Sequence, residues 1–373
     1  MGNEKALGRI ERSIGVEGIS GKLAKLALSD LTMVLIETAN NITADQIPTD
    51  LLKNYTAKRQ FFGPNRISQR ELIHFEQLCY DGLPEHFESV QLSPIAPLGT
   101  NAVLTSLSQN NTLSTIRGSE VVSDVTTQLA LECATRDTSE EIVNLASMGR
   151  VLRLQPFDSS KGYMQHFNLF NLCSGGKVIG QNINSPMVAD HIDSLLGVIG
   201  HLNENGYGMK NISVNITDIN FMEQLMELQG IPRNVLNKHS LDEAFDVFST
   251  YHVDFPKVVE DLEDLTPDKF AGIGMKDYSK YYAGIYRDII ADLKKAHPNV
   301  RFNFDFNRKA GLGYYRNLCF HIFCEDESGN TVQLADGGSV DWLAKLKNDS
   351  KNTMVISGIG AELIQKLFAN QEA

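Results

Sequence analysis

The sequence predicts an α+β fold in which helices flank an antiparallel sheet. Segments in which apolar and polar residues alternate, such as 211–217 and 301–306, are typical of strands with one buried face. Hairpin-like loops join several of these strands, and amphipathic helices lie between them at irregular positions, which favours an antiparallel sheet over a doubly wound parallel one. A chain of 373 residues with 42% hydrophobic content can enclose one large core and a smaller module.

The first segment of the chain, 1–60, is predicted to be an N-terminal helical extension. Its apolar residues recur at spacings near three and four, and Pro48 marks a break. The turn sequence FFGPN follows. The segment 67–84 then predicts an amphipathic helix that Gly82 and Pro84 end.

The first part of the predicted core, 61–230, continues with strands and helices. Strands interrupted by proline are expected over 86–100, and a helix or a buried strand over 126–136. Two apolar runs bracket a polar loop within 149–176, which predicts an antiparallel hairpin whose loop carries Lys161. A long helix, a strand and a second helix are expected to complete this part.

An acidic segment, 231–280, separates the two parts of the core and predicts an inserted helical module. The second part of the core, 281–373, is expected to begin with a helix. Strands and a short closing helix are then expected, in this order, over 300–306, 317–326, 331–338, 352–360 and 361–370.

Composition excludes several classes of partner. The net charge of −12 argues against DNA or an RNA backbone as the main partner, because phosphate contacts need clustered Lys and Arg. The N-terminus lacks the apolar core of a signal peptide, and no apolar run is long enough to span a membrane, which predicts a cytoplasmic protein. Five scattered cysteines without CxxC spacing predict reduced, buried thiols and no metal site.

Four segments, taken in order, carry motifs of one family. IAPLGTNAVL at 95–104 is similar to R-P-E-G-T-A-x-V, and 150–167 is similar to F-R-Y-E, a polar loop and R-E-F. AGLGYYRNLCFHIF at 310–323 is similar to R-G-L-D-Y-Y-T-x-x-V-F-E. ADGGSVDWL with ISGIGAEL, within 335–363, is similar to G-G-G-R-Y-D-G-L with G-I-E-R-L. Together they resemble the catalytic core of histidyl-tRNA synthetases, a class II aminoacyl-tRNA synthetase fold, over most of the chain.

The resemblance implies a pocket for a small ligand. The residues that would bind the ligand are Gly99, Thr100, Arg153, Gln155, His166, Tyr314, Tyr315, Asp341 and Glu362. The candidates for catalytic cations are Arg153, Lys161, Arg308 and Lys309.

Simpler interpretations stand beside these roles. Arg153 could be a surface residue of the sheet, and the tyrosine pair could be core and rim aromatics. His166 could be a hydrogen-bonded strand histidine, since no second His or Cys lies nearby at metal or dyad spacing. Arg308 and Lys309 could form a solvated strand end or could replace a missing cation.

The chain departs from the family at the charged positions. Amino-acid activation brings a carboxylate to the α-phosphate of ATP, and guanidinium groups suit the stabilisation of two anions. Where the family has arginine, this chain has Ala310, Ser339 and Leu363, and Leu98 and Gly313 replace acids. We therefore expect that histidine is not activated by the family's route.

These expectations lead to two functional hypotheses. In the first, the chain is a non-translating paralogue that binds an amino acid or a nucleotide as a regulatory or complex-forming subunit. The resemblance supplies a precedent for this role, the regulatory subunit of ATP phosphoribosyltransferase. It also implies a homodimer and a partner enzyme. We expect tRNA to be an unlikely partner, because no anticodon-binding domain follows the core. In the second, an active ligase uses ATP and Mg²⁺ to form an acyl-adenylate and transfers it to an acceptor other than tRNA.

Overall fold

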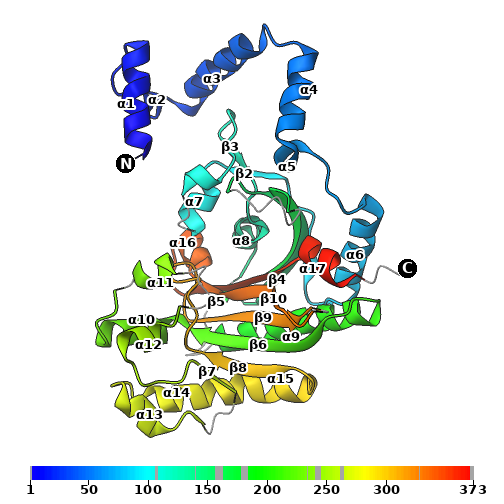
Figure 1. Cartoon of the computed structure of the whole chain (residues 1–373), viewed down its shortest axis with the longest axis vertical. Helices are drawn as coiled ribbons and strands as arrows, with labels where there is room; N and C mark the ends of the chain where they lie inside the picture. Colours follow the sequence, from blue (N-terminus) through cyan, green and yellow to red (C-terminus); the bar gives the residue numbers. More distant parts are fainter. Residues whose placement is uncertain are drawn as a thin grey trace.

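The computed structural model describes residues 2–105, 108–138, 140–155, 163–177, 184–232, 234–239, 245–260, 264–326 and 328–369. The chain begins with five helices that form an arm over one side of the molecule (Figure 1). They are α1 (Gly2–Ile14), α2 (Ile19–Leu23), α3 (Leu28–Thr43), α4 (Pro48–Ala57) and α5 (Arg59–Phe62). The helical prediction for this segment is therefore confirmed, and Pro48 begins a helix because its fixed φ suits the first turn.

The elements of the first core part follow the predicted order. They are α6 (Gln69–Asp81), β1 (Glu88–Ser89), β2 (Ile95–Pro97), α7 (Thr100–Thr105), η1 (Gln109–Asn111), β3 (Ser119–Val121), α8 (Val125–Thr135), β4 (Val143–Leu152), β5 (His166–Lys177), α9 (Asn184–Glu204), β6 (Lys210–Asp218) and α10 (Ile219–Leu228). Helix α6 begins at a capping box in which Ser68 and Glu71 bond each other's backbone.

The remaining elements complete the sheet. They are α11 (Asn234–Lys238), α12 (Val247–Tyr251), β7 (Val258–Val259), α13 (Pro267–Gly272), α14 (Tyr278–Ile285), the π-helical η4 (Tyr286–Ile290), α15 (Ala291–Ala296), β8 (Arg301–Asp305), β9 (Leu318–Glu325), β10 (Thr331–Val340), α16 (Trp342–Lys347), β11 (Asn352–Gly360) and α17 (Ala361–Phe368). The segment 231–280 holds helices as expected, and its short strand β7 also pairs with β8 at the sheet edge.

A nine-stranded sheet has the order β1-β4-β5-β11-β10-β9-β6-β8-β7. Its pairs are antiparallel except β1 with β4 and β6 with β8, so the predicted antiparallel α+β class is correct. The predicted hairpin is the pair β4 and β5, in which Leu152 lies opposite His166. A separate two-stranded sheet pairs β2 with β3.

The two faces of the sheet are covered by different helices. On one face α9 packs against the strands, and Phe170, Ile192 and Phe320 lie in the core between the helix and the sheet. On the other face the sheet curves around α8 (Figure 1), and Leu129, Cys173 and Trp342 are buried there. The five cysteines are free and buried. None of the described helices is long and apolar enough to cross a bilayer.

Gly338 in β10 gives a sharp test of this sheet packing. A Cβ at this position would lie 2.5 Å from Cys319 Cβ and 2.7 Å from Cys319 Cα, so neighbouring backbone would have to move. We expect G338A to lower the free energy of unfolding by about 2 kcal/mol or more, because overpacking forces a rigid core to shift. Urea denaturation would measure it. The control is G200A at an exposed position of α9, where an added Cβ would have nothing within 4 Å and should not be destabilising. Equal losses in both variants would contradict the packing.

Candidate ligand-binding site

An open pocket of about 890 Å³ lies beside the first turn of α8. Strands β5, β10 and β11 contribute to its lining, together with the loop 309–315 and the turn before α8. The lining residues with polar side chains are Asn101, Thr105, Asn111, Ser123, Asp124, Thr126, Arg153, Gln155, Asn171, Lys309, Tyr314, Tyr315, Gln333, Asp336 and Ser357. The pocket thus combines charges of both signs with hydrogen-bonding groups.

Five of the residues singled out from the sequence line this pocket. They are Arg153, Gln155, Lys309, Tyr314 and Tyr315. They come from the end of β4 and from the loop before β9, which are distant in the chain and meet because β5, β11, β10 and β9 are successive neighbours in the sheet. Lys161 lies outside the described residues.

The loop 309–315 depends on its two glycines. Gly311 and Gly313 have φ of 96° and 86°, in the left-handed region that favours glycine. A Cβ on Gly311 would also lie 2.8 Å from the ring of Tyr315. The loop closes because the backbone N–H groups of Tyr314 and Tyr315 both donate to the Gly311 carbonyl. The sequence AGLGYY therefore builds a tight aromatic wall, in which Ala310 adds no charge.

The wall is fixed to α8 through an acid that the sequence analysis did not single out. The Tyr314 hydroxyl donates to Asp124 Oδ2 at 3.2 Å, and Asp124 Oδ1 accepts from the backbone and hydroxyl of Thr126. Burial and the neighbouring Asp124 carboxylate raise the pKa of Tyr314 well above its usual range, so the phenol stays protonated. Asp124 caps α8, and such a cap is hard to distinguish from a site residue in the sequence.

Arg153 brings a cation to the same wall. Its Nε donates to the Ser123 carbonyl at 3.0 Å, and its guanidinium lies 5.2 Å from the centre of the Phe167 ring. Its own backbone N–H donates to the carbonyl of Gln165, the residue that precedes β5. The guanidinium is thus held over the Phe167 ring and bonded to Ser123, the residue that precedes Asp124, so a cation and a carboxylate both lie near the first turn of α8.

Arg308 is buried and does not form the solvated strand end considered from the sequence. Its side chain is 2% exposed, its Nη2 donates to Asp336 Oδ1 at 2.8 Å, and its Nε donates to the Ala310 carbonyl. The guanidinium lies 5.2 Å from the centre of the Tyr315 ring, behind the loop and outside the pocket lining. Asp336 therefore neutralises this cation, while Lys309 lines the pocket itself.

Gly99 and Thr100 serve the local backbone at the start of α7. Gly99 has a φ of 92°, and its N–H donates to Glu120 Oε2 at 2.8 Å. The Thr100 hydroxyl donates to the Pro97 carbonyl. Neither residue lines the pocket, although the neighbouring Asn101 of the same helix does.

His166, Glu362 and Asp341 also lie outside the pocket lining. His166 contacts Arg150 Nη1 through Nδ1 at 2.7 Å and the Gly63 carbonyl through Nε2 at 2.8 Å, and burial together with Arg150 lowers its pKa. Glu362 accepts from Arg150 and from the Asn168 N–H, while burial raises its pKa. Asp341 pairs with exposed basic residues near α16.

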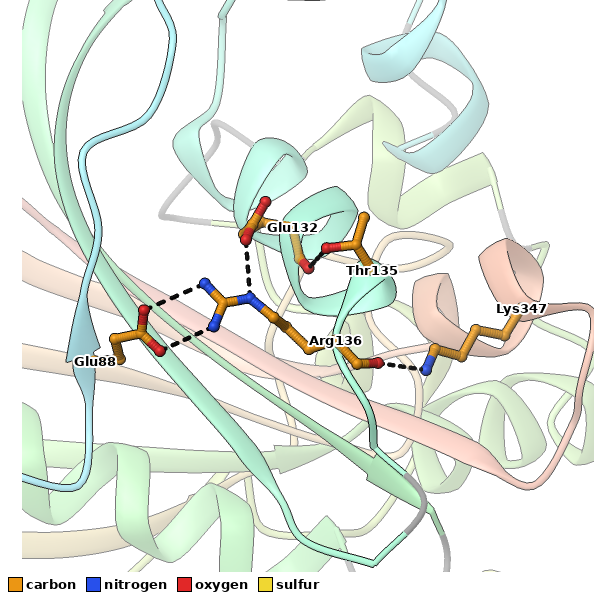
Figure 2. A network of polar contacts seen from close by, with 5 residues as sticks. All are labelled: Glu88, Glu132, Thr135, Arg136 and Lys347. Carbon is orange, nitrogen blue, oxygen red and sulfur yellow. Dashed lines mark hydrogen bonds and ion pairs between the residues drawn. The ribbon is translucent and has the colours of Figure 1, made fainter.

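An ion network holds the far end of α8, the helix whose first turn carries Asp124. Arg136 donates to both carboxylate oxygens of Glu88 at 3.0 and 3.2 Å and to Glu132 at 2.9 Å (Figure 2). Lys347 of α16 donates to the Arg136 carbonyl at 3.0 Å (Figure 2). Strand β1 and helix α16 are thereby linked to the C-terminal end of α8.

The pocket has charges but no obvious metal centre. Among the described residues, no three His, Cys, Asp or Glu side chains are grouped as metal ligands. Asp336 is already engaged by Arg308, which leaves Asp124 as the other acid of the lining.

Comparison with known proteins supports the fold at low sequence identity. No protein-family model and no curated protein matches this sequence. A solved ATP phosphoribosyltransferase regulatory subunit/histidyl-tRNA synthetase from Bacillus halodurans aligns over 83% of each chain with 14% identity and a TM-score of 0.58.

Two further solved structures give similar values. A histidine–tRNA ligase subunit from Alicyclobacillus acidocaldarius is 14% identical, covers 81% of this chain and 94% of its own, and has a TM-score of 0.56. Histidyl-tRNA synthetase from Nostoc sp. PCC 7120 is 14% identical, with coverages of 80% and 72% and a TM-score of 0.57. The chain therefore has the α+β fold of a histidyl-tRNA synthetase-like class II catalytic core.

Proposed function

We propose that this chain is a non-translating paralogue of histidyl-tRNA synthetase that binds a small ligand and acts as a regulatory or complex-forming subunit, as a homodimer and with a partner enzyme. The observation that carries the proposal is the pocket beside Asp124. It keeps Arg153 and the aromatic wall, while Ala310 and Leu363 line it where the family has arginines. The pocket can hold a ligand, but it lacks these two arginines, which would stabilise the charge that develops on a transferred group.

An amino acid suits the lining better than a nucleotide. Arg153 offers a cation for a carboxylate, and Asp124 offers an acceptor for an ammonium group on the same wall. Leu363 supplies an apolar surface where the family's arginine would lie against adenine. The cationic Arg153 and the anionic Asp124 together match a zwitterion, whereas a triphosphate would need more positive charge than Arg153 and Lys309 provide.

The proposal predicts no ATP–pyrophosphate exchange with histidine and binding of at least one amino acid. Thermal-shift screening of amino acids and nucleotides, followed by calorimetry, would find the ligand. R153M should then raise the dissociation constant at least about tenfold, because a charge-assisted contact is lost. The control R301M removes an exposed arginine of β8 and should bind normally. Histidine-dependent exchange would contradict the proposal.

A second function has one observation in its favour. Arg153 and Lys309 both line the pocket, so two cations remain near any bound phosphate. An ATP-dependent ligase that acts on an acceptor other than tRNA would use them. Exchange with an amino acid other than histidine, lost in both R153M and K309M, would favour this ligase over the regulatory subunit.

A further inference from the structure

The pocket lining contains a second carboxylate, Asp336, which the proposed function does not use. Its side chain is 39% exposed. Arg308 donates to its Oδ1 at 2.8 Å, and His321 Nε2 lies 3.6 Å from the same oxygen. Neither of these two partners belongs to the pocket lining. Among the described residues, Asp336 Oδ2 has no hydrogen-bond partner. One oxygen of this acid is therefore engaged outside the pocket, and the other remains for a ligand.

Asp336 shares one face of the sheet with Asn171. Asn171 in β5 lies opposite Gly358 in β11, and Gly358 lies opposite Asp336 in β10. Residues directly opposite each other on neighbouring strands point to the same face of a sheet. All three residues line the pocket, and the glycine leaves a gap between the two polar side chains. We call Asn171, Gly358 and Asp336 the pocket floor.

The side-chain amide of Asn171 has an acceptor without a donor. The residue is 5% exposed, and its Nδ2 donates to the Ser357 carbonyl at 3.3 Å. This bond sets the orientation of the amide, because a flipped amide would bring Oδ1 against another carbonyl oxygen. Oδ1 is buried and has no partner among the described residues. A buried acceptor in this state is costly, which indicates that a hydrogen-bond donor is missing from the floor.

The glycine of the floor lets the amide lean toward the acid. An added Cβ at Gly358 would collide with Asn171 Nδ2 and would lie 3.0 Å from the Phe170 carbonyl oxygen. The amide of Asn171 and the carboxylate of Asp336 therefore offer two acceptors on either side of one glycine. An ammonium or guanidinium group has several N–H donors and no acceptor, so it suits this pair, whereas a carboxylate has acceptors only.

The aromatic wall lies near both acids of the pocket. Burial, followed by the carboxylates of Asp124 and Asp336, raises the pKa of Tyr314. Burial also raises the pKa of Tyr315, and there the Asp336 carboxylate raises the pKa more than the Arg308 guanidinium lowers it. The potential at the wall is therefore negative although a buried cation is close by. Such a potential and the faces of aromatic rings both favour a cationic ligand group.

The remaining lining suits the methylene chain of a basic side chain. Leu169, Leu312 and Ile356 add apolar side chains to it. Long basic side chains bury their methylene groups along apolar surface while the charged end reaches polar groups. The Lys309 ammonium group lies 5.9 Å from the centre of the Phe245 ring, which is not part of the lining. This cation of the protein therefore already has a contact outside the pocket.

We propose that the pocket is selective for a basic amino acid, with its side-chain cation held between Asn171 and Asp336 on the pocket floor. Arg153 and Asp124 hold the α-carboxylate and the α-ammonium group. This inference rests on the amino-acid site of the proposed function and specifies its ligand class. A neutral apolar side chain would leave the two acceptors of the floor without donors, and an acidic one would meet Asp336 with a like charge.

Two pairs of ligands test this selectivity on the unaltered chain. Calorimetry would compare lysine with norleucine, which lacks the terminal ammonium group, and arginine with citrulline, in which a neutral urea group replaces the guanidinium. In the pair that binds better, we expect the basic ligand to bind at least about tenfold more tightly, because the neutral one loses charge-assisted hydrogen bonds. If a neutral or acidic amino acid bound as tightly as any basic one, the selectivity would be wrong but the amino-acid site would stand. If no amino acid bound, both proposals would be wrong.

Variants of the floor test where the cation binds. N171L removes the acceptor at similar side-chain size, and R308M/D336N removes the acid together with its buried cation. We expect the affinity ratio of the basic to the neutral ligand to fall about fivefold in N171L and to about one in the double variant. Retained binding of the neutral ligand would show that each variant pocket is folded. The control is N303L, because Asn303 Nδ2 donates to Asn215 at 2.8 Å outside the lining, and its ratio should not change. An unchanged ratio in both floor variants would overturn the proposal.

Discussion

Lowering the pH from about 7 to about 5 is expected to remove about 2 kcal/mol of stability through His191 alone. This ring is fully buried between Ser357 and Ser174, with Nδ1 and Nε2 at 2.7 and 2.8 Å from their hydroxyl oxygens. Burial, with a smaller contribution from His86, lowers the pKa of His191 to about 3. In the unfolded chain the pKa returns to about 6.5.

The direction of this change in stability depends on whether the folded or the unfolded chain binds the proton. Between pH 6.5 and about 3 the unfolded chain is protonated at this position and the folded chain is not. Stability is therefore fully present above the unfolded pKa, and it falls by about 1.4 kcal/mol for each pH unit below it. Asp218 acts in the opposite direction at lower pH, because burial raises its pKa.

The variant H191Q separates the effect of His191 on the pH dependence of stability from that of the carboxyl groups. H191Q should be less stable than the natural chain near neutral pH, because the serine contacts are disturbed, but its free energy of unfolding should fall less between about pH 7 and about pH 5. Urea denaturation at several pH values gives both curves. H74Q, on the exposed face of α6, controls for the loss of a histidine. Parallel curves for the natural chain and H191Q would show that His191 is not the buried neutral group described above.

The second large effect concerns the buried pair of Arg308 and Asp336. D336N should lower the free energy of unfolding by about 3 kcal/mol, because it leaves a guanidinium that is 2% exposed without its counter-charge. R308M should cost less, since the Asp336 carboxylate is 39% exposed and water can reach it. The double variant R308M/D336N should be more stable than D336N, which is the signature of a relieved buried charge.

An ion pair that is more exposed serves as the control for these variants. D341N removes the partner of Arg316 and Lys345, whose side chains are 43% and 47% exposed, and should cost less than about 1 kcal/mol. Urea denaturation of all four variants completes the test. If D336N and D341N had the same small effect, Asp336 would not be the counter-charge that keeps Arg308 buried.

The sequence predicted the fold because strand patterning is local and strongly marked. The alternation over 301–306 and the apolar runs within 149–176 became β8 and the hairpin of β4 and β5. Strand β7 was not predicted, since its two residues give no period. The segment 126–136 could not be assigned between helix and strand, because α8 is buried nearly all round and its sequence shows little amphipathic contrast.

The site was harder to predict because it depends on partners far apart in the chain. Motif matching led to the residues of the loop 309–315 and to Arg153, which line the pocket. It did not lead to Asp124, which has the sequence context of a helix cap, or to Asp336, whose partner Arg308 is 28 positions away. His166 and Glu362 matched a motif, yet their contacts are with Gly63 and Arg150.

The Arg308–Asp336 pair also limits which side chains the loop 309–315 can accept. A310R would place a second guanidinium next to Arg308, whose Nε already bonds the Ala310 carbonyl. Like charges in close proximity oppose each other. Replacing Arg308 first would leave the Asp336 carboxylate without its cation. Each single step toward an arginine at position 310 therefore gives a less stable protein, and the buried pair acts as a selective filter on the sequence of the loop.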